Sequence, residues 1–510
     1  MCHIPRPRMG DLVAGATVAL VLVPQSLAYA SVAGLPPERG LLAALLPPMV
    51  GGIIGSSRYL HTGPTAMTAL LTFGALSTVA VPGSDEYIGL AIALALIVGI
   101  VRIAIGLLRW GGIVYLMSQT VVVGFAGAAS LLIIGSQVPS ALGTTTQDPN
   151  PLLAATIALA NPTAWEPASI AIALAAGAIV LASRLIHPVI PGSLIAVAGL
   201  TAASIAAGFG GAVLGAISVP LPLANVTLPF ESTPALLLPA VVIAVVGFAE
   251  PAAIARRYAA LDREPWDAGR EFVGQGAANL AAAVSGAFPV GGSFGRTALA
   301  RLAGARTRWT FVATSAAIGV ALVLLPLLSA LPVAVLAAIV IAAIALDLDL
   351  RSFRFYWQVA RLQFAVAAFT FVATIVTAPH IERGILLGVA AAVAAHLWRE
   401  NRVHAGASME GPTLHLRPRG VLYFGSAHRL EQALVRQLSL HREADGLVVH
   451  LDGLGRIDVT GAIALGRLLD DAIEAGLAVE IRDVPIQARH IVDRVLSRHL
   501  PAACSPPVDS

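Results

Sequence analysis

Two short glycine-containing segments, 63–66 and 292–296, hold the residue types that could bind an anion. Each segment opens an apolar helical pattern, and the first contains Pro64 while the second contains Arg296. A helix leaves its first amide N–H groups unpaired and carries partial positive charge at its N-terminus. Two such helix starts facing each other inside a membrane predict an anion site, with two packing kinks as the alternative.

Arg296 falls in the first turn of the second segment. A charged side chain at the centre of a bilayer costs about 2.5–3.5 kcal/mol, even on a lenient insertion scale. We therefore expect Arg296 to face the interior of a helix bundle or water, where it could attract an anion. The alternative is a structural ion pair with Glu250.

Glu250 directly follows the apolar run 241–249. A carboxyl group shielded from water favours its neutral form, so Glu250 could take up a proton. An anion carrier that captures a proton can use a proton gradient. Glu250 could instead be a structural partner for Arg296 or for a helix end.

Gln25 and Tyr29 are spaced by four residues and share one helical face. Both side chains could donate hydrogen bonds to a small anion, or they could hold neighbouring helices together. His61, next to the first glycine-containing segment, fits a loop position without a special role.

Apolar segments near the ~20-residue length that crosses a bilayer must position these side chains. Hydrophobic residues make up 57% of the 510 positions and charged residues only 12%, against roughly 25% charged in soluble domains. The predicted spans are 11–33, 38–55, 64–80, 87–108, 114–135, 168–186, 192–209, 235–255, 271–285, 293–304, 309–330, 332–346, 361–378 and 384–398. The composition predicts a polytopic α-helical membrane protein, whose first apolar segment is an uncleaved span.

The distribution of Arg predicts the orientation of these spans. The sequence contains no Lys, and cytoplasmic loops hold the Arg excess in membrane proteins. With Arg6 and Arg8 inside, the alternate loops are the basic ones, and the opposite loops 136–166 and 210–234 contain no Arg. An even number of spans then puts both termini in the cytoplasm.

The two glycine-containing segments also belong to a weak internal repeat. Aligned at Gly63 and Gly292, both read Gly-x-x-small-x-Thr-Ala-Leu. The repeats are predicted at about 10–215 and 235–398, within a transmembrane domain of residues 1–398. Gly- or Pro-interrupted segments at matching places in two halves point to a transporter binding site.

Charged residues become frequent after about Arg399. Residues 399–411 read as a polar linker, and residues 412–503 read as a small cytoplasmic α/β domain. Its predicted strands are 413–416, 421–424, 447–451 and 478–481, and its predicted helices are 427–441, 460–475 and 486–498.

Several classes of function lack their signatures in this sequence. It has no Gly-rich phosphate loop, no nucleophile elbow and no His/Glu metal cluster in the spans, so we predict neither an enzyme, nor a metal site or other cofactor, nor an ATP-driven pump. Cys2 and Cys504 lie at opposite ends and make no disulfide framework. Arg falls in short gaps between apolar segments, which argues against a nucleic-acid surface.

The motifs, taken in order, resemble the SulP sulfate-permease family, which includes the animal prestin and pendrin proteins. The resemblance is carried by the segments 24–30, 33–41, 55–66, 124–137, 271–279 and 288–297. It implies fourteen spans in two inverted repeats of seven, which form a core and a gate domain with helices three and ten as half-helices.

The same resemblance implies an anion site between the starts of the third and tenth helices, lined by the first helix. Carried onto this sequence, the substrate-binding residues are Gln25, Tyr29, Thr65, Ala66, Ser293, Phe294, Gly295 and Arg296. Glu250 matches an acidic position that serves cation coupling in some members, and the resemblance leaves proton and sodium coupling both open.

The segment 451–461 resembles the STAS module, which is similar to bacterial anti-sigma-factor antagonists. In soluble relatives the position of Thr460 is a phosphorylatable Ser at a helix N-terminus, so Asp458 and Thr460 are the candidate regulatory residues. The module implies a homodimer and docking of a cytoplasmic partner.

The sequence thus leads to one functional hypothesis and its rivals. The hypothesis is secondary active transport of a carboxylate, dicarboxylate, sulfate or bicarbonate across a bacterial inner membrane, as proton-coupled symport by alternating access, with sodium as the second choice of coupling ion. The rivals within transport are an anion exchanger and an uncoupled anion channel. The rival from another class is a membrane-anchored signalling scaffold that acts through the STAS module.

Overall fold

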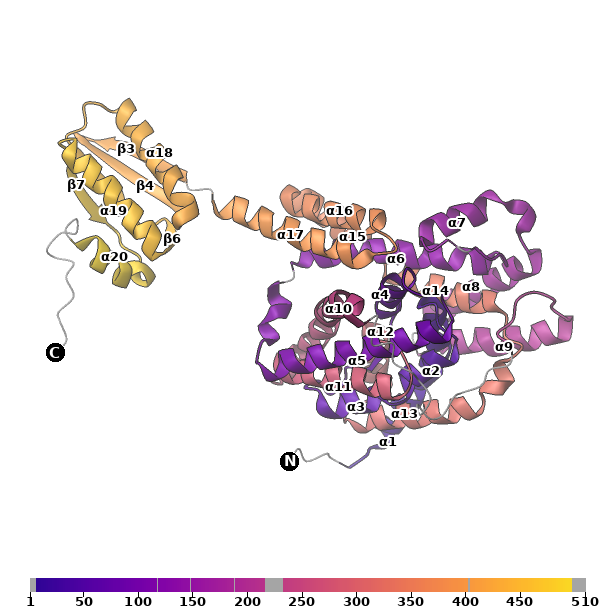
Figure 1. The fold of residues 1–510 in the computed structure, drawn as a ribbon. Coiled ribbons are helices and arrows are strands. Elements are labelled where there is room, and N and C mark those ends of the chain that lie inside the picture. The colour runs from indigo at the N-terminus through magenta and orange to yellow at the C-terminus, as the bar shows by residue number, and fades with distance from the viewer. Residues whose placement is uncertain are drawn as a thin grey trace. The chain divides into compact units, whose positions relative to one another are not determined.

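The chain divides into two compact units, Met1–Ala391 and Ala392–Ser510, in a computed structural model (Figure 1). The structure describes residues 6–116, 118–146, 148–187, 189–215, 233–401 and 404–497. Cys2, Cys504, the centre of the predicted loop 210–234 and the end of the predicted domain 412–503 lie outside the described residues.

In the part that the structure describes, the regular structure of the first unit is helical apart from one two-residue strand pair and an isolated bridge between Val213 and Pro332. Its first half contains α1 (Met9–Val32), α2 (Glu38–Leu45), α3 (Pro47–Ile54), α4 (Ala66–Leu76), α5 (Asp85–Leu107), α6 (Gln119–Ala141), α7 (Pro151–Ala160), α8 (Pro167–Ile186) and α9 (Gly192–Ala207). Its second half contains α10 (Thr233–Asp262), α11 (Ala268–Val284), α12 (Phe294–Leu302), α13 (Trp309–Val323), α14 (Val333–Asp347), α15 (Leu350–Val359), α16 (Arg361–Val376) and α17 (Ile381–Glu400).

Each of the fourteen predicted spans coincides with helical structure, and the second is broken into α2 and α3 just before Pro47. Helices α1, α5, α6, α8, α10 and α17 are long and apolar enough to cross a membrane. Shorter apolar helices are α4, α7, α9, α13, α14 and α16. The first unit is therefore a polytopic helical membrane domain, as the composition predicts.

Helices α7 and α15 lie outside the predicted spans. Helix α7 falls inside 136–166, which the sequence analysis assigned to a loop, so that assignment was wrong there. Its start signals are present, because the Asn150 side chain accepts hydrogen bonds from the Leu152 and Leu153 amides and Pro151 occupies the first turn. The missed helix has only 10 residues, which is too short for a search based on full membrane crossings.

Glycines let helices α5 and α11 of the first unit pack closely against each other. A Cβ atom on Gly99 would lie 3.0 Å from the Gly276 carbonyl oxygen, and one on Gly276 would lie 2.8 Å from the Gly99 carbonyl oxygen. Small residues of this kind let two helix backbones pack directly against each other within a membrane. The contact gives α11 a fixed position, and α11 in turn holds the two segments described below.

The second unit contains a mixed sheet and three helices (Figure 1). Its elements are β3 (His404–Glu410), β4 (Thr413–Leu422), α18 (Phe424–Leu440), β5 (Gly446–His450), β6 (Leu454–Ile457), α19 (Val459–Glu474), β7 (Ala478–Arg482) and α20 (Arg489–Val495). The strand order is β3-β4-β5-β7, with β6 paired to β4. Only β3 and β4 are antiparallel; the other pairs are parallel.

The predicted linker 399–411 is wrong for most of its length. The end of α17 occupies 399–400, and β3 pairs with β4 over seven residues from His404 to Glu410. The sequence gives only a weak strand signal here, because the inward residues Ala405, Ala407 and Met409 are small or flexible and alternate with polar or glycine positions. These three side chains pack against the apolar core of the second unit.

Candidate functional site

The two glycine-containing segments meet as a short antiparallel strand pair. Thr62 lies opposite Gly292, and Gly63 lies opposite Gly291, in strands β1 (Thr62–Gly63) and β2 (Gly291–Gly292). The Ser293 amide donates to the His61 carbonyl oxygen at 3.0 Å. Because the strands are antiparallel, the chain leaves the pair in opposite directions into α4 and α12.

A stripe of buried polar side chains on α11 holds both segments in place. The Glu271 carboxylate accepts hydrogen bonds from the amides of residues 56 and 57, at 3.0 and 2.7 Å. Gln275 donates from Nε2 to Thr62 Oγ1 at 2.6 Å. Asn279 accepts from the Val290 amide at 3.0 Å and donates to the Val290 carbonyl oxygen at 3.1 Å. The spacing of four residues puts all three donors and acceptors on one helical face.

The starts of α4 and α12 differ in how their amides are satisfied. Thr65 caps α4, since its hydroxyl accepts a hydrogen bond from the Thr68 amide at 3.2 Å. Ser293 is the N-cap residue of α12 and makes no side-chain cap bond. The first intrahelical bond of α12 runs from the Thr297 amide to the Ser293 carbonyl oxygen. The preceding amides of α12 therefore have the partial positive charge and the free N–H groups that suit an anion.

Arg296 connects the two helix starts. Its side chain is 2% exposed, and its Nη1 donates to the Pro64 carbonyl oxygen at 2.9 Å. Its Nε and Nη2 atoms have no hydrogen-bond partner among the described residues. These two nitrogens form one edge of the guanidinium fork, which can donate two parallel hydrogen bonds to an acceptor with two oxygens.

A cavity of about 310 Å³ lies beside this arrangement. Six of the eight predicted substrate-binding residues line it: Gln25, Tyr29, Ser293, Phe294, Gly295 and Arg296. The guanidinium of Arg257 lies over the Phe294 ring, 5.3 Å from its centroid, and adds positive charge on this side of α12. A Cβ atom on Gly295 would meet nothing within 4 Å.

Three predicted residues lie outside the cavity lining. Thr65 and Ala66 are buried at the start of α4, where Thr65 acts as a cap. Glu250 is half-buried in α10, directly before Pro251. Glu250 and Tyr29 both interact electrostatically with Arg296.

The far wall of the cavity comes from helices that carried no site prediction. Its residues are Val180, Ser183 and Arg184 of α8, Ile190, Gly192 and Ser193 at the start of α9, and Ile339 and Ala343 of α14. Most of these residues are apolar or small, which gives no chemical signal in the sequence. Arg184 is the exception, since it is a charged residue in the last turn of the apolar helix α8.

Two further buried residues, His61 and Arg102, lie beside the strand pair. His61 lies in the loop directly before β1, is 1% exposed and packs edge-on against the Phe311 ring. Arg102 of α5 is fully buried and donates to the carbonyl oxygens of Ile243, Ala244 and Val290. The signal for Arg102 was a single Arg inside an apolar span.

The candidate regulatory residues lie at the start of α19. Asp458 is the N-cap residue, and its Oδ1 accepts a hydrogen bond from the Gly461 amide at 2.6 Å. Thr460 is exposed in the first turn. No group of three or more His, Cys, Asp or Glu side chains within the described ranges could hold a metal ion.

Comparisons with known proteins agree with this arrangement. The model of the sulfate permease family matches residues 9–370. A probable sulfate transporter of Mycobacterium tuberculosis is 35% identical over 395 residues, which cover 76% of this chain and 69% of that protein. A sodium-independent sulfate anion transporter of Bos taurus is 27% identical over 511 residues, covering 92% and 83%. The murine anion transporter Slc26a9, in an inward-facing state, has the same fold with a TM-score of 0.87 at 19% identity, over 98% of this chain and 90% of that one.

Proposed function

Because this chain belongs to the sulfate permease family and is a multi-pass membrane transporter of anions, we propose that it carries a small oxyanion by secondary active transport. The substrate class is a carboxylate, dicarboxylate, sulfate or bicarbonate. The binding residues are Gln25, Tyr29, Thr65, Ala66, Ser293, Phe294, Gly295 and Arg296, with Thr65 and Ala66 acting through the start of α4.

The observation that carries this proposal is that Arg296 is buried with two hydrogen-bond donors unpaired among the residues that the structure describes. A buried guanidinium whose Nε and Nη2 lack partners in the described part of the chain leaves costly donors unsatisfied. A bound oxyanion would accept hydrogen bonds from both nitrogens. The uncapped first turn of α12 adds amide donors and partial positive charge on the same side of the cavity.

The geometry of the donors favours an oxyanion over a halide. Two parallel N–H groups match two oxygens of one carboxylate, bicarbonate or sulfate, whereas a halide offers a single acceptor centre. The cavity volume of about 310 Å³ is small for a ligand pocket, since such pockets have volumes of roughly 300–1,000 Å³. A small solute therefore fits better than a large organic anion.

We assign the coupling role to Glu250. Its charge acts on Arg296, so a proton on Glu250 changes the field at the proposed site without any contact between the proton and the anion. Proton symport is the mode that we propose, and sodium is the second choice. The bovine relative is a sodium-independent sulfate anion transporter, and this similarity favours the proton.

We further propose that the protein resides in a bacterial inner membrane with both termini in the cytoplasm. The cavity reaches Arg184 and Leu302, at the ends of α8 and α12. Both ends precede the Arg-rich side of the predicted topology. The cavity would then open towards the cytoplasm, and alternating access would require the site to face the other side in turn.

The second unit has a proposed regulatory role. We propose a transport domain of residues 1–398 and a STAS-like module predicted at 412–503. Strand β3 (His404–Glu410) pairs with β4 and therefore extends this module towards the N-terminus. We propose that the module supports a homodimer and docks a cytoplasmic partner, with Asp458 and Thr460 at the regulated helix start.

Uptake of labelled sulfate, bicarbonate and a dicarboxylate into proteoliposomes tests the proposal. Accumulation that requires an acidic exterior supports proton symport. Uptake that requires an anion inside the vesicle supports exchange, and uptake that only dissipates the anion gradient supports a channel. Deletion of residues 405–510 tests the scaffold reading, because transport that survives the deletion removes it.

A further inference from the structure

The sheet of the second unit has one face packed on helices and one face that carries polar side chains. Helices α18, α19 and α20 share a core with residues of β4 and β5, including Leu414, Leu416, Leu447 and Val449. The strand register puts the intervening residues on the opposite face. His415 lies there opposite Val448, and His450 lies there opposite Arg482.

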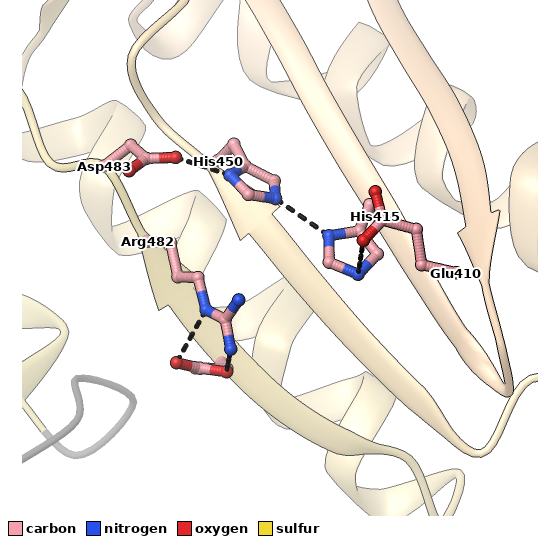
Figure 2. Close-up of polar contacts among 6 residues, drawn as sticks. Glu410, His415, His450, Arg482 and Asp483 are labelled. Atoms are coloured by element: carbon pink, nitrogen blue, oxygen red, sulfur yellow. Dashed lines mark hydrogen bonds and ion pairs between the residues drawn. The ribbon is translucent and has the colours of Figure 1, made fainter.

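Four side chains on this face form a continuous chain of polar contacts (Figure 2). His415 Nδ1 and His450 Nε2 are 2.9 Å apart, and His450 Nδ1 lies 2.5 Å from Asp483 Oδ2. At the other end, His415 Nε2 lies 3.5 Å from Glu410 Oε2. Both imidazole rings are buried, each residue being 7% exposed, while both carboxylates reach solvent.

The ring geometry fits a direct N–H···N hydrogen bond. The ring planes are inclined by only 26°, with centroids 5.2 Å apart. The rings therefore meet edge to edge through their facing nitrogens rather than face to face. One of these two nitrogens must carry a proton and the other must not, since two N–H groups or two lone pairs would repel each other at 2.9 Å.

The carboxylate of Asp483 fixes which nitrogen is which. It can only accept, so His450 Nδ1 carries a proton, and the neutral ring of His450 then presents a bare Nε2 to its neighbour. His415 must donate to it from Nδ1. With both rings neutral, His415 Nε2 is left bare and faces the Glu410 carboxylate, acceptor against acceptor.

We propose that the His415–His450 pair is a binding site for a single proton, taken up at His415 Nε2. The added proton turns the mismatched contact with Glu410 into an ion pair and leaves the hydrogen bond between the rings intact. A second proton would have to sit on His450 Nε2, where it would face the Nδ1–H group of His415. The pair therefore accepts one proton and excludes the next.

The surrounding charges also favour a single positive charge on the pair. Glu410 of β3, Glu480 of β7 and Asp483 after β7 supply carboxylates, while Arg482 of β7 supplies one cation. Hydrogen bonds from Arg482 hold the pKa of Glu480 below its ordinary value, so Glu480 stays ionised. Arg417 and Arg419, two and four residues after His415, are further cations on this face of β4, and both are exposed to solvent.

Proton binding at this site acts on β3. This strand is the edge of the sheet, and Glu410 is its last residue before the turn at Gly411. The contact from His415 to Glu410 is formed with the proton bound and is lost without it. Because β3 is the first strand after α17, the acidity of the surrounding water sets how firmly the sheet holds the segment that follows the last membrane helix.

Nitrogen NMR of the full chain, labelled with ¹⁵N-histidine and reconstituted in lipid, tests the stoichiometry between about pH 5 and about pH 8. Difference spectra against His415→Gln and His450→Gln assign the two rings. We expect His415 Nε2 to gain a proton on acidification, while His450 Nε2 stays bare and a nitrogen–nitrogen coupling persists between the rings. Two doubly protonated rings at the acid end, or no titration of His415, would overturn the proposal.

Hydrogen exchange of the β3 amides gives a second measurement. After correction for the intrinsic rate, exchange in the wild type should be about twofold to fivefold slower at the acid end, the size of an exposed ion pair. Glu410→Gln leaves both buried rings in place and should remove this difference. His428→Gln, which changes an exposed histidine on α18, should keep it. An acid effect that survives in Glu410→Gln would contradict the assignment.

Discussion

Gln275 and Thr62, which are 213 residues apart in the sequence, are joined by a side-chain hydrogen bond of 2.6 Å. The bond ties the start of β1 to α11, and Asn279 ties the residue before β2 to the same helix. The position of the two helix starts therefore depends on α11 as well as on the strands themselves.

Replacement of Gln275 by Ala should lower the stability of the protein. The change removes the partner of the buried Thr62 hydroxyl, and the loss of a buried hydrogen bond costs about 1–3 kcal/mol. The thermal unfolding midpoint in detergent should fall, whereas Gln363→Ala, at an exposed position of α16, should leave it unchanged. Equal midpoints for the two variants would mean that α11 does not hold β1.

Replacement of Arg296 by Lys should weaken anion uptake although the charge is kept. Lys cannot present the two parallel donors of Nε and Nη2, and one charge-assisted hydrogen bond contributes about 1.5–3 kcal/mol. We expect KM for the anion to rise on the order of tenfold to a hundredfold, and Arg296→Ala to be more severe. Arg351→Ala, at an exposed position of α15, is the control. Unchanged uptake in Arg296→Ala would remove Arg296 from the site.

Replacement of Glu250 by Gln should abolish the dependence of uptake on a proton gradient. Gln keeps the shape of the side chain but binds no proton. The initial rate in proteoliposomes should become the same with and without an imposed pH difference. Glu86→Gln, in the exposed first turn of α5, should behave as the wild type. Retained dependence in Glu250→Gln would refute the coupling role.

Replacement of Gly295 by Val should impair transport without unfolding the protein. A Cβ atom at this position would meet nothing within 4 Å, and the rest of the side chain would occupy volume beside the cavity that the anion needs. Uptake should fall about fivefold to a hundredfold if crowding of the bound anion costs about 1–3 kcal/mol, as overpacking of a filled site does. Gly199→Val also places its side chain in open space, but away from the cavity, and should transport normally. Normal uptake by Gly295→Val would mean that the anion does not pass Gly295.

The helix starts could be predicted because backbone breaks leave local signals. Gly, Pro and Thr at 63–65 and Gly and Ser at 292–293 mark the end of extended chain and the start of a helix. The alignment at Gly63 and Gly292 is nevertheless displaced by one residue. The N-cap residues are Thr65 and Ser293, so Gly63 corresponds to Gly291, which is also its partner in the strand pair.

The cavity wall and the supporting contacts could not be predicted in the same way. Val180, Ile339 and Ala343 line the cavity because α8 and α14 pack beside α1 and α12, and apolar residues of this kind look alike wherever they lie. Arg102 and His61 depend on long-range packing as well. Only the three-dimensional path of the chain shows that Arg102 reaches the carbonyl oxygens of α10.

The backbone pairing of Thr62 with Gly292 constrains how the protein can change shape. Two peptide strands that share hydrogen bonds, and that are pinned to one helix, cannot slide past each other without breaking those bonds. The starts of α4 and α12 must therefore move together, and an anion bound between them would move with them as part of one rigid body. A conformational change would therefore take place at the contacts between this rigid body and the cavity wall formed by α8, α9 and α14, and not between β1 and β2.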